Sequence, residues 1–291
     1  MDNAPDKSVF TQVKILLDMI KIEHTVFALP FAFMGALLAA RGLPSGRQGF
    51  FILIAMVGAR SAAMAFNRLV DEPIDAANPR TRDRALPRGL ISRRAAILFI
   101  LGAAAVFFLA ASQLNRLCLL LSPLALVWVL FYSYTKRFTS LSHLFLGGGL
   151  AIAPAAGWLA VRGDLTLTPL VLSAAVLFWV AGFDVLYSLQ DDEFDRGMGL
   201  FSLPSRLGRV PAMRLALVFH LLAGGGFLLT GWLAGLGAIY FTAAACTALL
   251  LVAEHRLISP TDLSRLNHAF FTVNGLVGVI LGAATLFSLW P

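Results

Sequence analysis

Three side chains that carry oxygen ligands stand four residues apart at the end of an apolar run. At this spacing Asn67, Asp71 and Asp75, here called the first motif, share one face of a helix. A hard cation such as Mg2+ binds one or two carboxylates and leaves its other positions to water and phosphate oxygens. Arginines, whose planar cations suit a polyanion, lie within and after the motif: Arg68, Arg80, Arg82, Arg84 and Arg88. We therefore predict a site for magnesium and a diphosphate.

A second stretch, reading DVLYSLQDDEFD over residues 184–195, ends another apolar run. Asp191 and Asp195 repeat the four-residue spacing, and Tyr187 stands where the amide stands in the first motif. These three residues are here called the second motif, and Asp184 lies a further turn into the apolar run. Two acidic helix ends of the same design predict metal ions on both sides of one diphosphate.

An arginine lies inside the apolar run that leads to the first motif. Arg60 precedes Asn67 by two turns and falls on nearly the same helical face. A charged side chain inside a membrane span is costly and marks either a function or a buried partner. Arg60 is thus a substrate contact or a structural partner of a buried carboxylate such as Asp184. We favour the substrate contact because Arg60 shares the face of the motif.

Basic and aromatic residues also end the fourth apolar run, at Tyr132, Tyr134, Lys136 and Arg137. Tyrosine at this position is commonly a membrane anchor, and basic residues there also set the orientation of the chain. They bring a second cationic element from a different helix. We include Tyr132, Lys136 and Arg137 among the candidate substrate contacts.

The composition is that of an integral membrane protein. Of the residues, 58% are hydrophobic and 13% are charged, and the mean hydropathy is +0.80. Each apolar run is close to the roughly 20 residues that a helix needs to cross a bilayer. We predict an all-α fold, a bundle of nine transmembrane helices, with spans at 24–41, 49–70, 95–113, 116–134, 142–161, 167–189, 213–232, 234–253 and 269–290.

The 23 lysine and arginine residues are distributed unevenly among the predicted loops. Apart from Arg60, the side away from the two motifs holds only Arg41, Arg47, Arg116 and Arg162. By the positive-inside rule the amino terminus and both motifs then face the cytoplasm. The same bias accounts for most of the net charge of +7, so we exclude nucleic acid as a partner.

The chain shows no linker or low-complexity segment, so we predict one membrane domain over residues 1–291. Residues 1–23 form a cytoplasmic amino-terminal segment, in which an amphipathic helix over 9–21 lies on the membrane surface. The polar segment 196–212, punctuated by glycine and proline, is a candidate lid over the site.

Small and polar residues inside the spans indicate helix packing. Glycine runs at 147–149 and 224–226 allow helices to approach closely. Asn274, near the start of the last span, is expected to form hydrogen bonds between helices.

The motifs resemble those of the UbiA-type intramembrane aromatic prenyltransferases. The similar stretches are NRLVDEPID with RTRDRALPRG, DVLYSLQDDEFD, and YSYTKRFT after the fourth span. FNRLVD and GFDVLYSLQD most resemble the 4-hydroxybenzoate polyprenyltransferase branch, which includes relatives assigned to a dihydroxynaphthoate in a menaquinone route. The family often has Asp where this chain has Arg68, which changes the local charge but leaves the spaced ligands intact.

The resemblance implies roles for the motif residues. The implied Mg2+ ligands are Asn67, Asp71, Asp75, Asp191 and Asp195. Arg60 matches the family's arginine that faces the aromatic acid, and Lys136 and the loop arginines match its diphosphate contacts. The candidate substrate-binding residues are Arg60, Arg80, Arg82, Arg88, Tyr132, Lys136, Arg137, Asp184 and Tyr187. The catalytic candidates are Asp71, Asp191 and Lys136.

The resemblance also implies a reaction, the transfer of a polyprenyl group from polyprenyl diphosphate to an aromatic acid in ubiquinone or menaquinone biosynthesis. The expected acceptor is 4-hydroxybenzoate, and a dihydroxynaphthoate is the second candidate. The expected location is a bacterial inner membrane, with the site facing the cytoplasm. The pattern is also compatible with a haem farnesyltransferase, a lipid-forming prenyltransferase and, in a different class, a secondary transporter. Acidic residues at helix ends, rather than at the centres of broken spans, favour the enzyme.

Overall fold

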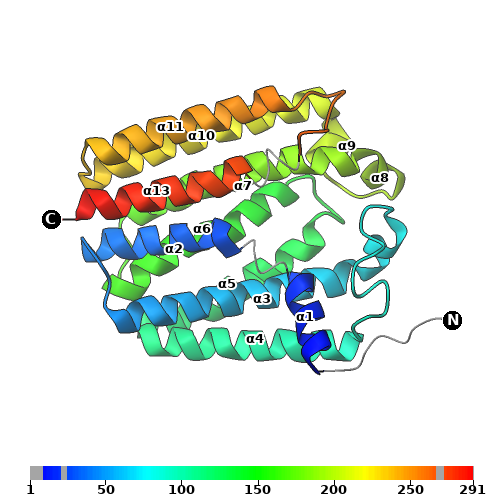
Figure 1. Ribbon diagram of the computed structural model, residues 1–291, viewed down its shortest axis with the longest axis horizontal. Helices are drawn as coiled ribbons and strands as arrows, with labels where there is room; N and C mark the ends of the chain where they lie inside the picture. Colours follow the sequence, from blue (N-terminus) through cyan, green and yellow to red (C-terminus); the bar gives the residue numbers. More distant parts are fainter. Residues whose placement is uncertain (1–8, 21–24, 267–271, 291) are drawn as a thin grey trace.

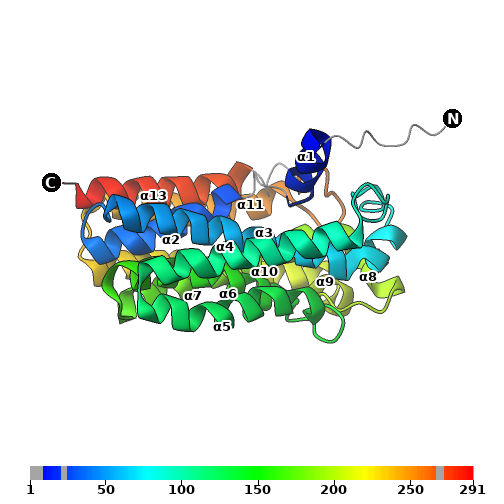
Figure 2. The ribbon, with the colours of Figure 1, turned by 90° about the horizontal axis from the view of Figure 1, so that it is seen from below.

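The computed structural model of this protein describes residues 9–20, 25–266 and 272–290. Within these ranges the regular elements are helices, and none is a strand. The long helices lie side by side, as Figure 1 shows from one direction and Figure 2 after a turn of 90°. The prediction of an all-α fold is confirmed.

Long helices follow one another along the described chain. They are α2 (Thr25–Ala40), α3 (Gly46–Ala77), α4 (Arg93–Leu114), α5 (Arg116–Thr135), α6 (Ser142–Arg162), α7 (Leu167–Ser188), α10 (Arg209–Ala234), α11 (Ala238–Leu257) and α13 (Asn274–Leu289). A short helix, α1 (Val9–Ile20), precedes them, and three short elements join α7 to α10: η2 (Leu189–Asp191), α8 (Asp192–Gly197) and α9 (Leu203–Leu207).

Among the described residues, seven helices are long and apolar enough to cross a membrane: α3, α4, α5, α6, α10, α11, and α7 with its continuation to Gly197. Two others, α2 and α13, are apolar but shorter. Parts of the predicted first and ninth spans fall at 24 and 269–271, outside the described residues. Leu98, Trp232 and Leu249 are each about 70% exposed on their helices, which suits contact with lipid. The protein is an integral membrane protein, and the count of nine spans stays a prediction.

The helix α3 is longer than the predicted span at 49–70, and this length carries the whole first motif on regular helix. Ser45 and Gln48 form a capping box that fixes its start. The helix passes through Pro73 and ends before Pro79, where the Asn78 N–H still donates to the Ile74 carbonyl.

Glycines allow the helices to approach closely, as their runs in the sequence predict. A Cβ atom on Gly147 of α6 would lie 2.4 Å from the Leu177 carbonyl oxygen of α7. A Cβ on Gly226 of α10 would lie 2.7 Å from the Cβ of Ala175 on α7. Both contacts are shorter than real Cβ atoms show, so these positions admit only glycine without a shift of the backbone.

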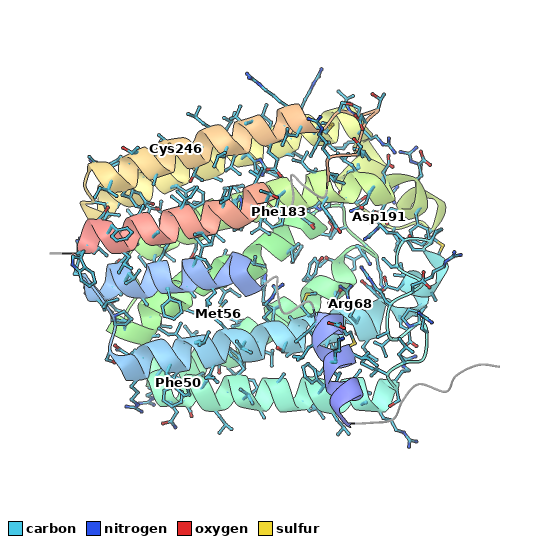
Figure 3. All side chains as sticks on the ribbon, viewed as in Figure 1. Phe50, Met56, Arg68, Phe183, Asp191 and Cys246 are labelled. Atoms are coloured by element: carbon cyan, nitrogen blue, oxygen red, sulfur yellow. The ribbon has the colours of Figure 1, made fainter. Side chains whose placement is uncertain are left out.

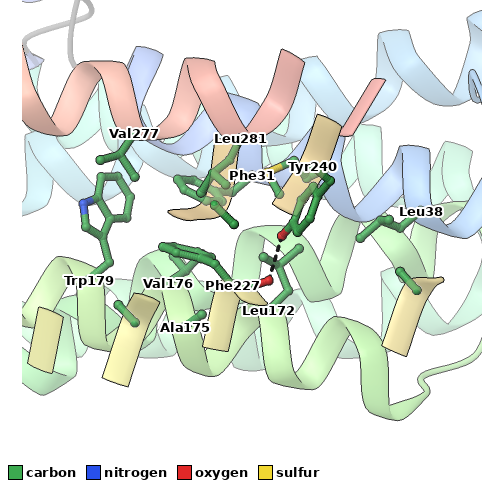
Figure 4. Packing of buried hydrophobic residues seen from close by; sticks show 14 of the residues in the cluster. Phe31, Leu38, Leu172, Ala175, Val176, Trp179, Phe227, Tyr240, Val277 and Leu281 are labelled. Carbon is green, nitrogen blue, oxygen red and sulfur yellow. Dashed lines mark hydrogen bonds between the residues drawn. The ribbon is translucent and has the colours of Figure 1, made fainter. Parts of the chain in front are cut away.

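The largest buried cluster joins α2, α6, α7, α10, α11 and α13, and Figure 4 shows part of it. The Tyr240 hydroxyl donates to the Phe227 carbonyl at 3.0 Å. At one end of the cluster the Trp179 Nε1–H donates to Asn274 Oδ1 at 2.8 Å, and the Asn274 amide donates to Glu254 at 2.9 Å. The prediction of interhelical hydrogen bonding by Asn274 is confirmed.

The amino-terminal helix α1 crosses α3 near the end where the first motif lies (Figures 1 and 2). Its last residues, Met19 and Ile20, are buried in a cluster with Ala65 and Ile91. The Arg68 Nε–H donates to the Met19 carbonyl at 3.4 Å. The predicted helix over 9–21 is thus present over 9–20, and its position on a membrane surface stays a prediction.

Candidate active site

A cavity of about 590 Å³ lies within the bundle and extends to the end of the bundle where the two motifs lie. Most of its walls come from α3, α5, α6 and α7. Residues of α2, α4, η2 and α8, of the loop after α3 and of the segment 201–202 also contribute to the lining. Figure 3 labels Arg68 and Asp191 at this end, with Met56 and Phe183 further along the helices, and all four residues line the cavity.

All three residues of the first motif line the cavity from α3. Asp71 and Asp75 are buried, at 3% and 4% exposure. The Asn67 amide donates to Asp71 Oδ2 at 3.1 Å. The continuous helix therefore aligns the three oxygen-bearing groups on one face, as their spacing predicts.

Cations from other elements contact the two buried aspartates of the first motif. The Lys136 Nζ lies 2.7 Å from Asp71 Oδ2, and the Arg137 Nη2 lies 3.0 Å from Asp71 Oδ1. Both cations stand where α5 ends. Arg84, from the loop after α3, donates to both oxygens of Asp75 at 2.7 and 2.8 Å. Close opposite charges compensate these carboxylates for the loss of water.

The second motif is less regular than the first. The helix α7 ends at Ser188, and a 3-10 turn over Leu189–Asp191 separates it from α8, which carries Asp195. Tyr187, Asp191 and Asp195 nevertheless all line the same cavity as the first motif. The two motifs, far apart in the sequence, are therefore brought together at one end of the bundle.

The loop after α3 connects the two motifs directly. Arg80 donates to Asp191 through Nε at 2.9 Å and Nη2 at 2.5 Å, and the Asn78 amide donates to the same carboxylate at 3.1 Å. The Arg80 guanidinium also lies over the Tyr187 ring, 5.8 Å from its centroid. Burial lowers the pKa of Arg80, but the hydrogen bond and charge of Asp191 outweigh burial and raise that pKa above its usual value.

The other candidates divide into those that line the cavity and those that do not. Arg60, Tyr132, Lys136 and Asp184 line it together with the two motifs. Arg137 contacts Asp71 and the Val70 carbonyl but does not line the cavity. Arg82 and Arg88 are exposed and lie outside the lining.

Some polar residues of the cavity wall were not among the candidates: Asn78, His143 and Ser202. Arg68 and Arg84, which also line it, were predicted only as members of the arginine group around the first motif. The sequence indicated Arg84, because it is a cation of the same arginine-rich loop as Arg80. His143 carried no such signal. It is a single histidine beside an apolar run, and its partner, Asp184, lies 41 residues away.

In the described part of the cavity lining, formal negative and positive charges are equal in number. Five carboxylates line it, from Asp71, Asp75, Asp184, Asp191 and Asp195, and five cations line it, from Arg60, Arg68, Arg80, Arg84 and Lys136. Among the described residues, no three His, Cys, Asp or Glu side chains converge closely enough to hold a metal on their own. The donor set still fits Mg2+, which takes one or two carboxylates and completes its shell with water and phosphate oxygens.

Fold and site together define a helical integral membrane protein with a charged cavity at one end of its bundle. The family model described as "UbiA prenyltransferase family" matches residues 28–276. The chain belongs to the UbiA prenyltransferase family, and it is a transferase of prenyl groups. This membership removes the support for a secondary transporter.

Curated relatives cover most of the chain. One from Nitrosospira multiformis is 31% identical over 252 residues, which is 87% of this chain and 87% of the relative. One from Vibrio cholerae (strain N16961) is 30% identical over 259 residues, covering 87% of this chain and 89% of the relative. Both are named 4-hydroxybenzoate octaprenyltransferase.

Solved structures share the fold. A UbiA homologue from Aeropyrum pernix K1 superimposes with a TM-score of 0.83 at 38% identity, over 92% of this chain and 99% of that one. A UbiA homologue from Archaeoglobus fulgidus, solved with DMAPP and Mg2+, has a TM-score of 0.73 at 17% identity, over 94% of this chain and 98% of that one. At 17% identity the second comparison concerns the fold alone.

Proposed function

We propose that this protein transfers a polyprenyl group from polyprenyl diphosphate to an aromatic acid, and that the acid is 4-hydroxybenzoate. The observation that carries the proposal is the meeting of both aspartate motifs with Lys136, Arg80 and Arg84 around one cavity. The names of the relatives and the DMAPP and Mg2+ bound by the archaeal homologue support it. A role in quinone biosynthesis follows from the acceptor.

The proposed site binds the diphosphate at the charged end of the cavity. Bound Mg2+, held by residues of the two motifs, would neutralise charge on the departing diphosphate. Lys136, Arg80 and Arg84 stabilise that same charge as the allylic C–O bond breaks. The lining further along the bundle is largely apolar, with Ala59, Phe107 and Val129 among its residues. It excludes water, which would otherwise capture the allylic cation.

The acceptor binds beyond the diphosphate in this proposal. Arg60 lies seven residues before Asn67 on α3, which is about 10 Å along the axis at 1.5 Å per residue. A guanidinium there matches a carboxylate through two parallel hydrogen bonds. The ring carbon beside the phenol oxygen attacks the allylic carbon and then loses its proton. A dihydroxynaphthoate, which also carries a carboxylate, is the second candidate because Arg60 suits both acids.

The test is an activity panel with the purified protein in lipid nanodiscs and Mg2+. Prenyl diphosphates of several lengths are each combined with 4-hydroxybenzoate, 1,4-dihydroxy-2-naphthoate, haem B or glycerol phosphate lipid precursors, and products are identified by mass spectrometry. We expect prenylated 4-hydroxybenzoate as the main product. A main product from an acceptor without a carboxylate on an aromatic ring would refute the proposal.

The orientation and the domain organisation belong to the same proposal. We place both motifs on the cytoplasmic side of a bacterial inner membrane, because lysine and arginine gather in the loops on that side. We treat residues 1–291 as one membrane domain, and the segment 196–212 as a lid whose Phe201 and Ser202 line the cavity.

A further inference from the structure

A histidine–aspartate pair lines the cavity apart from the two motifs. His143, on the first turn of α6, lies with Nδ1 2.7 Å from Asp184 Oδ2 on α7. The His143 side chain is 3% exposed, and the Asp184 side chain is 21% exposed. Both residues line the cavity. The more exposed partner is therefore the carboxylate.

The second nitrogen of the histidine fixes the direction of this hydrogen bond. The backbone N–H of Leu203, at the start of α9, donates to His143 Nε2 at 3.2 Å. A nitrogen that accepts a hydrogen bond carries no hydrogen of its own, so the ring hydrogen is assigned to Nδ1. His143 therefore donates to Asp184 Oδ2. The bond orients the carboxylate and leaves Oδ1 as an acceptor.

The pair lies deeper in the bundle than the second motif. Asp184 precedes Tyr187, the first residue of the second motif, by three residues, and Arg60 precedes Asn67, the first residue of the first motif, by seven. The helices α3 and α7 both end at the motifs, so Arg60 and Asp184 both lie inward from that end. One wall of the inner cavity thus carries a cation and another carries an oriented hydrogen-bond acceptor.

We propose that Asp184 accepts the hydrogen bond of the acceptor's phenolic hydroxyl and that His143 is the residue that positions Asp184 for it. The inference rests on the proposed function. It names Asp184 as the residue that distinguishes a hydroxylated aromatic acid from an acid without the hydroxyl. An acid with a hydroxyl opposite its carboxylate has one group for Arg60 and one for Asp184. A hydrogen bond from the phenol to a carboxylate also enriches the ring in electrons, which favours attack on the allylic carbon.

The first test compares affinities for acids with and without the hydroxyl. Binding of 4-hydroxybenzoate and of benzoate to the Mg2+-supplemented protein in nanodiscs is measured by calorimetry. A hydrogen bond to a charged group corresponds to about 10- to 100-fold in affinity, so the wild-type protein should prefer 4-hydroxybenzoate by that factor. In Asp184→Asn the preference should fall to a few-fold, while benzoate binding changes little.

The control for Asp184→Asn is Asp164→Asn. Asp164 lies outside the cavity lining and pairs with Arg162 and the Trp158 ring N–H. This variant should keep the wild-type preference. A preference that survives in Asp184→Asn would overturn the assignment of the hydroxyl to Asp184. If the wild-type protein neither binds nor prenylates any acid of the panel, the proposed function itself is wrong.

The second test separates positioning by His143 from simple packing. In His143→Asn the amide nitrogen replaces Nδ1 and keeps the donor to Asp184. In His143→Gln the longer amide reaches the Leu203 N–H but loses that donor. We expect His143→Asn to keep KM for 4-hydroxybenzoate within a few-fold, and His143→Gln to raise it as much as Asp184→Asn does, with KM for prenyl diphosphate unchanged in both.

A double variant, His143→Gln with Asp184→Asn, should be no worse than Asp184→Asn alone, because both changes remove one interaction. The reverse order of the single variants, with His143→Gln near wild type and His143→Asn impaired, would assign His143 to anchoring the loop at Leu203 and overturn the positioning role. Unfolding temperatures of all variants in nanodiscs show whether each retains the fold.

Discussion

Three of the four aspartates in the two motifs are paired with cations from other elements. Asp71 is paired with Lys136 and Arg137, Asp75 with Arg84, and Asp191 with Arg80. Removing one partner of a buried pair leaves the other charge uncompensated and costs about 3–5 kcal/mol. A variant that tests chemistry should therefore keep the shape and the hydrogen bonds of the carboxylate.

The metal prediction follows from the assignment of Mg2+ and diphosphate to both motifs. Asp71→Asn and Asp191→Asn should each lower kcat by at least about 100-fold, because a neutral amide does not compensate Mg2+. EDTA should abolish turnover in the wild-type protein, and added Mg2+ should restore it. The measurement is the initial rate of prenyl transfer. Glu193→Gln, an exposed neighbour outside the cavity lining, is the matched control and should keep wild-type turnover.

Arg60 decides the class of acceptor in our proposal. Arg60→Ala should raise KM for the aromatic acid by about 10-fold or more, because the carboxylate of the bound acid would then be buried without its cation. KM for prenyl diphosphate should stay within a few-fold. Arg60→Lys should rescue only in part, since an ammonium lacks the planar fork of a guanidinium. Steady-state kinetics with each substrate varied in turn give both constants, and the opposite pattern would move Arg60 to the diphosphate.

The charged residues show how far residue types and spacing predict a site. Asn67, Asp71 and Asp75 were found because a regular helix turns their spacing into one face. The arginine loop was harder, because it has no regular period: Arg80 and Arg84 turn inward onto aspartates, while Arg82 and Arg88 face outward. His143 was beyond reach, because tertiary packing alone brings it to Asp184.

At the scale of whole helices, apolar length predicted the bundle well and the helix ends less well. The helix α3 continues well past the apolar run, because polar residues that leave the membrane can remain helical. The helix α7, in contrast, ends at Ser188 within the second motif, and a 3-10 turn follows over Leu189–Asp191, although this motif repeats the spacing of the first. Equal spacing therefore did not predict equal helix geometry. The packing glycines were predictable because small residues are the means by which membrane helices approach.

The contact of α6 with α7 provides a test at this scale. Gly147→Ala should destabilise the protein by about 1–3 kcal/mol, because the added Cβ would lie 2.4 Å from a backbone oxygen of α7 and must push the helices apart. Gly102→Ala on α4 is the matched control, since its Cβ would meet nothing within 4 Å. Thermal unfolding midpoints in the same detergent provide the comparison. Equal midpoints for the two variants would show that α6 and α7 are not this close.

For the molecule as a whole, the two motifs must open to the same side of the membrane, since both contact one diphosphate in the proposed reaction. The helices α3 and α7 end on that side, with Ala77 exposed after the first motif and Met198 exposed after the second. Leu43, between α2 and α3, is 65% exposed at the other end of the bundle. Labelling from each side of the membrane therefore tests the arrangement.

Single cysteines at these three positions are introduced after both native cysteines, Cys118 and Cys246, have been replaced by alanine. A membrane-impermeant maleimide is applied to right-side-out and inside-out vesicles. We expect Ala77→Cys and Met198→Cys to react only in inside-out vesicles, and Leu43→Cys only in right-side-out vesicles, because the positive-inside rule places the arginine-rich loops in the cytoplasm. Reversal at all three positions would correct the orientation and leave the site intact. Labelling of Ala77→Cys and Met198→Cys from opposite sides would separate the motifs, and no single diphosphate would then be within reach of both.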